Sequence, residues 1–227
     1  PAILRTTTRV SHSRSLVEIG ERAVSEKAGF VKNPPRFVPI PVWGRPMRVR
    51  VEERLKNLQK LSESSPINRI EWRERNLGII SSSIAYQYAR EVWPEASFLK
   101  LGMSYPFPDA LIQEFASGVS SLLVIEELDD FIEQHVKALG VSCRGRDVVP
   151  GIMELSVDRL LASRARLEGT DSAEPKPSPF SEGLPPRPPV LCPGCPHRGV
   201  FYALGKEKVV VTGDIGCYSL GAFPPLN

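Results

Sequence analysis

Three short apolar runs, each followed by a helical segment, constrain the fold of this chain more than any other feature of its 227 residues. The runs have the length and composition of buried strands and span residues 77–81, 97–101 and 122–125. The segments that follow them have helical composition and span residues 84–93, 109–115 and 129–139. Strands and helices that alternate at this spacing predict an α/β fold, in which crossover helices join the strands of a parallel sheet.

Two proline-rich stretches lie on either side of this block. Five prolines between residues 33 and 46 argue against a continuous helix and predict an extended segment. Residues 49–61 then have the apolar spacing of a charged surface helix. The second stretch, residues 169–190, combines many prolines with few apolar side chains and therefore predicts a linker.

Charge is distributed unevenly along the chain. Up to Arg75 there are 16 Lys and Arg residues against 8 Asp and Glu, whereas the remainder has 13 against 18. Such a basic segment predicts a solvated connector or a face that meets another subunit. Nucleic-acid binding is disfavoured because neither interleaved aromatic residues nor a recognition-helix pattern accompanies the basic residues. No apolar run reaches the roughly 18 residues that indicate a membrane span.

Three of the four cysteines gather in the last 36 residues, in the motifs Cys192-Pro-Gly-Cys195-Pro-His197 and Gly213-Asp-Ile-Gly-Cys217. The first motif precedes a predicted helix over residues 197–204, and a β-branched run over residues 209–212 predicts a buried strand before Cys217. In a parallel sheet this order returns all three thiols to one edge, where such folds bind ligands. Their spacing suits an iron–sulfur cluster and a zinc ion equally. A thioredoxin-like dithiol is less well supported because a third cysteine shares the edge.

Other residues with reactive side chains favour structural interpretations. Cys143 has no partner at ligand spacing and is expected to be a structural thiol. Glu126 and Glu127 precede a predicted helix, where carboxylates interact favourably with the helix dipole. Because the cysteines are few and locally clustered, a disulfide framework is disfavoured and a reducing cytoplasm suits them.

The two cysteine motifs resemble the start of the thiamine-diphosphate-binding domain of 2-oxoacid:ferredoxin oxidoreductases. The resemblance rests on residues 191–199, Leu-Cys-Pro-Gly-Cys-Pro-His-Arg-Gly, and residues 211–221, Val-Thr-Gly-Asp-Ile-Gly-Cys-Tyr-Ser-Leu-Gly. Both are similar to the forms found in the large (α) subunits of the indolepyruvate type. Residues 6–13 resemble the end of the pyrimidine-binding domain of those subunits. Tyr105-Pro-Phe-Pro108 with Val124-Ile-Glu-Glu127 is similar to their transketolase C-terminal-like domain.

This resemblance implies a domain order that agrees with the proline-rich boundaries. Residues 1–30 would end a pyrimidine-binding domain, and residues 31–75 would form a basic connector with a helix. A transketolase C-terminal-like α/β domain, residues 76–168, and a linker, residues 169–190, would follow. Residues 191–227 would begin a thiamine-diphosphate-binding domain. We therefore expect an internal piece of a longer polypeptide, truncated at both ends and inactive by itself.

The resemblance further implies an oxidoreductase that converts arylpyruvates such as indolepyruvate to aryl-acetyl-CoA by oxidative decarboxylation, and passes the electrons to ferredoxin. Its cofactors would be thiamine diphosphate with Mg²⁺, held mostly by residues outside this sequence, and a [4Fe–4S] cluster. Its partners would be a smaller (β/γ-type) subunit, ferredoxin, coenzyme A and the arylpyruvate substrate, and neither nucleic acid nor a membrane. The cytoplasm is the expected compartment.

Carried over to this sequence, the family motifs assign three groups of site residues. The thiolates of Cys192, Cys195 and Cys217 would bind the cluster, with the fourth ligand beyond this chain. Arg9 and His12 would approach the thiamine and the substrate as catalytic residues. The residues that would contact the thiamine cofactor are His197, Gly199, Gly213, Asp214 and Gly216.

Structural interpretations of several of these residues stay open. A helix that begins near His197 offers free amide groups to a diphosphate, but a solvent-exposed side chain explains Arg198 equally well. Asp214 also fits an ordinary turn, and His12 also fits a loop of hydrogen-bonded hydroxyl groups.

Two other classes of function also stay open. The cysteines could bind zinc and stabilise a non-catalytic α/β interaction module. Alternatively, the protein could be a thiamine-dependent decarboxylase or synthase without a cluster. Metal analysis separates these classes, because only the oxidoreductase requires iron and sulfide.

Overall fold

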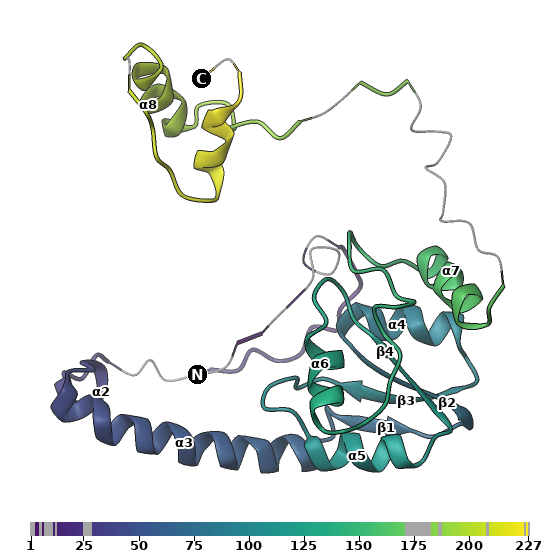
Figure 1. Cartoon of the computed structure of the whole chain (residues 1–227). Helices are drawn as coiled ribbons and strands as arrows, with labels where there is room; N and C mark the ends of the chain where they lie inside the picture. Colours follow the sequence, from purple (N-terminus) through teal and green to yellow (C-terminus); the bar gives the residue numbers. More distant parts are fainter. Residues whose placement is uncertain are drawn as a thin grey trace. The chain divides into compact units, whose positions relative to one another are not determined.

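The computed structural model describes residues 3, 4, 6, 11, 13–24, 29–170, 183–185, 188–207, 209–224 and 226. The chain divides into two compact units, Pro1–Pro175 and Lys176–Asn227 (Figure 1).

A four-stranded sheet organises the first unit, with its strands in the order β1-β3-β2-β4. The strands are β1 (Arg69–Glu71), β2 (Glu74–Ser82), β3 (Ala96–Leu101) and β4 (Ser121–Ile125). The central strand β2 pairs in parallel with both β3 and β4, and β1 pairs antiparallel with β3. The predicted parallel sheet and its three strands are therefore confirmed. The short edge strand β1 was not predicted, because three residues carry too little pattern to indicate a strand.

Helices cover both faces of this sheet (Figure 1). On one face, α4 (Ser83–Val92) and α7 (Val157–Leu167) pack over inward-facing side chains that include Ile79, Phe98 and Leu123. On the other face, α5 (Asp109–Ser117) and α6 (Phe131–Ala138) pack over side chains that include Ile80, Leu99 and Val124. Successive residues of a strand point to opposite faces, so the continuous apolar runs supply both cores. The three predicted helices of this block are confirmed, and α7 adds a fourth.

The proline-rich segment before the sheet is helical, which corrects the prediction of an extended segment for residues 33–46. It forms α2 (Pro34–Phe37) and the long helix α3 (Pro41–Ser64) (Figure 1). Pro34 and Pro41 occupy the first positions of their helices, where a backbone N–H has no partner within the helix. Only Pro46 lies inside α3, so the helix loses a single internal donor there and continues through a charged segment.

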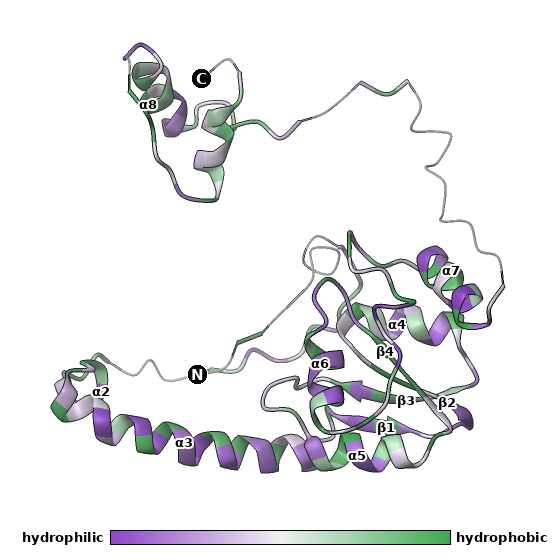
Figure 2. Ribbon diagram, in the orientation of Figure 1, coloured by the Kyte–Doolittle hydropathy of each residue, from purple (hydrophilic) through white to green (hydrophobic). Residues whose placement is uncertain are grey.

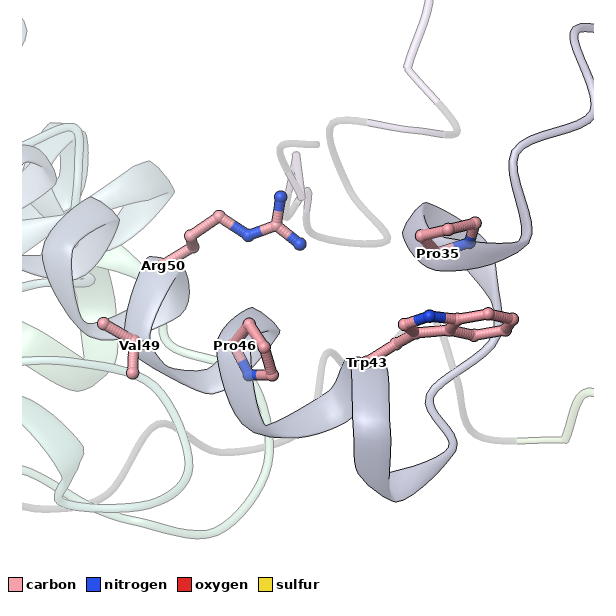
Figure 3. A pocket seen from close by; sticks show the side chains of 5 residues that line it. All are labelled: Pro35, Trp43, Pro46, Val49 and Arg50. Carbon is pink, nitrogen blue, oxygen red and sulfur yellow. The ribbon is translucent and has the colours of Figure 1, made fainter.

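The last turns of α3 attach it to the α/β block. The carboxylate of Glu63 accepts hydrogen bonds from the backbone N–H groups of Ala110 and Leu111, at 2.9 and 3.0 Å, and thereby caps the first turn of α5. The Gln59 amide donates to Asp109 at 2.9 Å. The beginning of α3 is open to solvent, and Figure 3 shows its Trp43 and Pro46 beside Pro35 of α2, around an apolar hollow.

The second unit contains α8 (Pro196–Leu204) and the short 3-10 helix η2 (Cys217–Ala222). The predicted helix over residues 197–204 is confirmed. The buried strand predicted over residues 209–212 is wrong, because residues 209–212 form no strand and Val210 is 94% exposed. A strand needs a neighbour to accept its backbone hydrogen bonds, and the described residues of this unit contain none.

Apolar residues occur in both units (Figure 2), but the two units differ in how far these residues are buried. Apolar residues are concentrated in β2, β3, β4 and the inward faces of their helices, whereas most apolar residues of the second unit are exposed. No helix in the described part of the chain is both long and apolar enough to cross a bilayer.

Candidate functional site

The first cysteine motif folds into a tight turn that carries both of its thiols. The backbone N–H of Cys195 donates to the carbonyl oxygen of Cys192 at 3.1 Å, which closes a four-residue turn. Pro193 occupies the second position of this turn, and Gly194 occupies the third with φ of +74°. Proline followed by a residue with positive φ is the pattern of a type II β-turn. The Pro-Gly pair therefore holds the two cysteines about 7 Å apart or less between Cα atoms.

Arg198 ties this turn to the helix that follows it. Its guanidinium Nε donates to the carbonyl oxygen of Cys192 at 3.0 Å, and its second terminal nitrogen donates to the carbonyl oxygen of Leu191. Leu191 is 4% exposed and anchors the chain on the entry side of the turn. Arg198 is exposed, which agrees with its interpretation as a solvent-exposed side chain. Both of its hydrogen bonds nevertheless join it to the cysteine loop.

Helix α8 begins directly at the second cysteine. Cys195 is the residue before the helix, with extended backbone, and Pro196 occupies the first helical turn. That turn has no acidic residue, so the partial positive charge of the helix end favours an anion, although Pro196 has no N–H and the N–H of Arg198 donates to the carbonyl oxygen of Cys195 at 3.1 Å. His197 is half-buried, and Gly199 has open space where a Cβ would stand. The first turn of α8 is therefore open at Gly199.

The second motif forms another turn, around Gly216. The Asp214 carboxylate accepts a hydrogen bond from the N–H of Ile215 at 2.7 Å, which agrees with the interpretation of Asp214 as a turn residue. Gly216 has φ of +128° and ψ of −150°, a backbone conformation that side chains with a Cβ rarely adopt. Its carbonyl oxygen accepts from the Ser219 hydroxyl at 2.6 Å. Gly213 is exposed, and open space surrounds the position that a Cβ would occupy there.

Two side-chain contacts join the turns into one packed unit. The ring of His197 meets the edge of the Tyr218 ring, with centroids 4.8 Å apart and planes at 65°. Gly221 of η2 lies so close to Phe201 of α8 that a Cβ would stand 2.6 Å from the ring. Because Tyr218 follows Cys217 directly, these contacts hold the second cysteine turn against the helix that begins at the first.

All four cysteines are free thiols. Cys192 and Cys217 are exposed, and Cys195 is half-buried. Within the described ranges, however, no group of three or more His, Cys, Asp or Glu side chains is arranged to hold a metal ion. The chain thus packs the two motifs together without bringing the three predicted thiols into a ligand set. The expected convergence on the edge of a sheet fails because the strand over residues 209–212 does not form.

Arg9 and His12, the two predicted catalytic residues, lie outside the described residues. Arg198 is the residue of this region whose contacts could not be predicted from the sequence. Residue types do not indicate which carbonyl groups its side chain contacts. The one signal in the sequence is its position three residues after Cys195.

The reactive side chains of the first unit have structural roles. The Glu126 carboxylate accepts from the N–H groups of Ile132 and Glu133, at 2.8 and 2.9 Å, which confirms its interaction with the start of a helix. Burial raises the pKa of this carboxyl group in spite of those two hydrogen bonds. Glu127 instead accepts from the N–H of Leu155 at 3.1 Å. Cys143 packs against the core beneath α5 and α6, and burial raises the pKa of its thiol.

Comparison with curated proteins identifies relatives over the whole chain. It is 40% identical over 252 residues to the indolepyruvate oxidoreductase subunit IorA of Methanothermobacter marburgensis, in an alignment that covers 100% of this chain and 40% of the relative. The subunits of the same name from Pyrococcus abyssi and Archaeoglobus fulgidus are 37% and 33% identical, over 99% and 100% of this chain. The chain thus spans about 40% of the length of these relatives. No protein-family model matches the chain.

Proposed function

We propose that the chain, which is 33–40% identical to indolepyruvate oxidoreductase subunits IorA over 99–100% of its length, belongs to their family and forms part of an enzyme that oxidatively decarboxylates arylpyruvates. In this proposal indolepyruvate is converted to the corresponding aryl-acetyl-CoA, and the electrons pass to ferredoxin. One observation supports it most: a turn with two free thiols packs, through α8, against the turn of a third. The chain covers about 40% of its relatives, so the activity is proposed for the whole protein.

The proposed domain assignment follows the architecture described above. Residues 76–168 contain most of the layered α/β block, which suits a transketolase C-terminal-like domain. Residues 31–75 would form the connector with α3, although β1 and the first residues of β2, which belong to the sheet, also lie before residue 76. Residues 191–227 would begin the thiamine-diphosphate-binding domain, and residues 1–30 would end the pyrimidine-binding domain.

The proposed metal ligands are the thiolates of Cys192, Cys195 and Cys217. The donor set fits in kind, because cysteine thiolates hold iron–sulfur clusters and these three are free and within one packed unit. A bound [4Fe–4S] cluster would supply one-electron transfer at this position. The protein's part is to present two thiolates from one rigid turn and the third from the neighbouring turn, with a fourth ligand from outside this chain.

The proposed contacts to thiamine diphosphate lie on the same two turns. Bound thiamine diphosphate would supply stabilisation of the carbanion that decarboxylation leaves. His197 and Gly199 lie in the first turn of α8, where the partial positive charge of the helix start suits a diphosphate. Gly213 and Gly216 leave room for close approach of the cofactor to the backbone, and Asp214 orders that turn. The Mg²⁺ site is proposed to lie mostly outside this chain.

Further proposals concern the substrate end of the site and the partners. Arg9 and His12 are proposed to approach the thiamine and the arylpyruvate. The subunit designation of the relatives supports a smaller partner subunit, and ferredoxin and coenzyme A complete the proposed set of partners. The free thiols suit the reducing cytoplasm.

The decisive experiment is metal analysis of the enzyme purified without oxygen together with its partner subunit. We expect iron and sulfide, with broad absorbance near about 400 nm that is typical of cysteine-ligated clusters. Separate Cys192→Ser, Cys195→Ser and Cys217→Ser variants should lose iron and electron transfer to ferredoxin. Cys143→Ser, in the core of the other unit, is the matched control and should keep both.

Two results would support the competing functions. Stoichiometric zinc without iron would replace the oxidoreductase with the zinc-stabilised interaction module. Electron transfer that survives in Cys217→Ser would favour a thiamine-dependent enzyme without a cluster.

A further inference from the structure

The guanidinium of Arg198 contacts two consecutive carbonyl groups of the cysteine loop. Nε lies 3.0 Å from the carbonyl oxygen of Cys192, and a terminal nitrogen donates to the carbonyl oxygen of Leu191. Arginine presents its donors in a rigid planar fork, so two acceptors on adjacent residues are matched by one side chain. A lysine in this place offers a single flexible ammonium group and cannot reproduce the fork.

One of these carbonyl groups also closes the turn that carries both thiols. The oxygen of Cys192 accepts the turn's own hydrogen bond from Cys195 and the bond from Arg198. Pro193 and Gly194 restrict the shape of the turn, but they do not determine how it is oriented on α8. The backbone N–H of Arg198 donates to the carbonyl oxygen of Cys195, and the Arg198 side chain adds two further hydrogen bonds, from the first turn of α8 to Leu191 and Cys192, that constrain this orientation.

We propose that Arg198 is a positioning residue that holds the Cys192–Cys195 turn on α8 so that both thiolates face one metal centre. The inference rests on the proposed function for the identity of that centre. The geometry is independent of the proposed function, because the hydrogen bonds of Arg198 are formed within the chain itself. Groups that orient metal ligands without touching the metal commonly change metal affinity by about 10–100-fold when they are removed.

Three variants separate the hydrogen bonds of Arg198 from its charge. Arg198→Lys keeps the charge and loses the fork, and Arg198→Gln loses both. Lys206→Gln is the matched control, because Lys206 is a cation at the other end of α8 whose ammonium group lies over the Tyr202 ring at 4.2 Å. It removes one positive charge from the same unit and leaves the cysteine loop untouched.

The first measurement is the rate at which an iron chelator removes iron from the complete enzyme, purified without oxygen with its partner subunit. Both Arg198 variants should release iron about 10–100-fold faster than the unaltered enzyme, and Lys206→Gln should be unchanged. Release within about twofold of the unaltered enzyme in both Arg198 variants would overturn the proposal. So would full recovery in Arg198→Lys alone, because charge and not the fork would then carry the effect.

The second measurement needs no cluster. Phenylarsine oxide bridges two neighbouring thiols, so its affinity for the metal-free, reduced enzyme reports whether Cys192 and Cys195 face one centre. We expect weaker binding in both Arg198 variants and unchanged binding in Lys206→Gln. Equal binding in all proteins would overturn the positioning role. An enzyme without iron that still shows the expected arsenical result would refute the proposed function and leave the role of Arg198 standing.

Discussion

The α/β block and the C-terminal unit obtain their shapes in different ways. In the block, strands β2, β3 and β4 supply two fully buried cores, and side chains such as Ile79, Phe98 and Leu123 are 0% exposed. In the C-terminal unit, Leu191 and Gly221 are the buried residues within the described part, while Val210 and Ile215 are 94% and 86% exposed. The block is held by buried apolar surface, and the unit by turns, ring contacts and a few hydrogen bonds.

This difference in burial indicates which part of the chain a bound metal or cofactor would stabilise. A layered sheet with two cores gains enough from burial to hold its shape through its own side chains. Residues 191–227 are proposed to begin a longer domain, so burial of their exposed apolar side chains would come from contacts outside this chain or from a bound group. The exposed thiols of this unit are therefore expected to respond more to a metal centre than the buried block does.

The largest expected effect comes from emptying the core of the block. Phe98→Ala removes a 0% exposed ring that meets Tyr86 edge to face, and should lower the free energy of unfolding by about 3–5 kcal/mol. The matched control is Phe223→Ala in the C-terminal unit, where the ring is 54% exposed and the cost should stay below about 0.5 kcal/mol. Urea denaturation followed by tryptophan fluorescence measures the first cost, because all three tryptophans lie in the first unit, and hydrogen exchange of the amides in α8 and η2 measures the second. Equal costs would contradict the comparison between the two regions.

A smaller effect should come from the hydrogen bond between Tyr86 and Glu71. The buried Tyr86 hydroxyl donates to the Glu71 carboxylate at 2.6 Å, so Tyr86→Phe should cost about 1.5–3 kcal/mol of stability at neutral pH. Tyr88→Phe removes the same group from a half-buried position of the same helix and should cost less. Chemical denaturation of the two variants side by side provides the measurement.

The same hydrogen bond should appear in the pH dependence of stability. Partial burial by itself raises the pKa of Glu71, but hydrogen bonds from Tyr86 and Arg69 and the charge of Arg90 outweigh it and leave the pKa below its usual value. A lowered carboxyl pKa stabilises the fold above the usual pKa, and this contribution is lost as the pH falls through the lowered value. Tyr86→Phe should therefore flatten the acid side of the stability profile. An unchanged profile would show that the hydroxyl has no such role.

Thiol reactivity compares the two regions directly. Burial raises the pKa of Cys143 in the block, whereas Cys192 and Cys217 are exposed. In the metal-free, reduced protein at about pH 8, iodoacetamide should modify Cys143 at least about tenfold more slowly, because less of it is thiolate and less is accessible. The gap should narrow as the pH rises and disappear in urea. Peptide mass spectrometry measures each site, and equal rates in the native protein would count against the half-buried position of Cys143.

The smallest expected effect concerns the contact between Gly221 and Phe201. A Cβ at position 221 would stand 2.6 Å from the Phe201 ring, so Gly221→Ala should loosen η2 from α8. The backbone N–H of Ser219 donates to the carbonyl oxygen of Gly216, so its hydrogen exchange reports on this turn. The exchange should accelerate about twofold to fivefold, which corresponds to a loss of about 0.5–1 kcal/mol in the local free energy of opening. The double variant Gly221→Ala with Phe201→Leu makes room for the methyl group and should restore protection. Equal exchange in all variants would mean that the contact does not hold the two turns together.

Predictions from the sequence agree with the structure in the α/β block and fail in parts of the chain outside it. Strands β2, β3 and β4 and the helices after them were predictable, because each apolar run is long enough to indicate burial and each helix has a marked end. The prolines of residues 33–46 were misinterpreted, since proline breaks a helix only where its N–H is needed. The run over residues 209–212 was misinterpreted because β-branched residues favour a strand only where another strand is present to pair with it.

The sequence by itself determined the parallel α/β block, the Pro-Gly turn between two cysteines and the start of α8, because burial patterns and turn residues act locally along the chain. Only the tertiary structure decided that Arg198 bonds to the carbonyl groups of Leu191 and Cys192, and that Tyr218 and Gly221 hold the second turn against α8. The physical reason is that a polar or aromatic side chain has several possible partners of equal chemistry. Which of them it meets depends on how the turns and helices around it pack together.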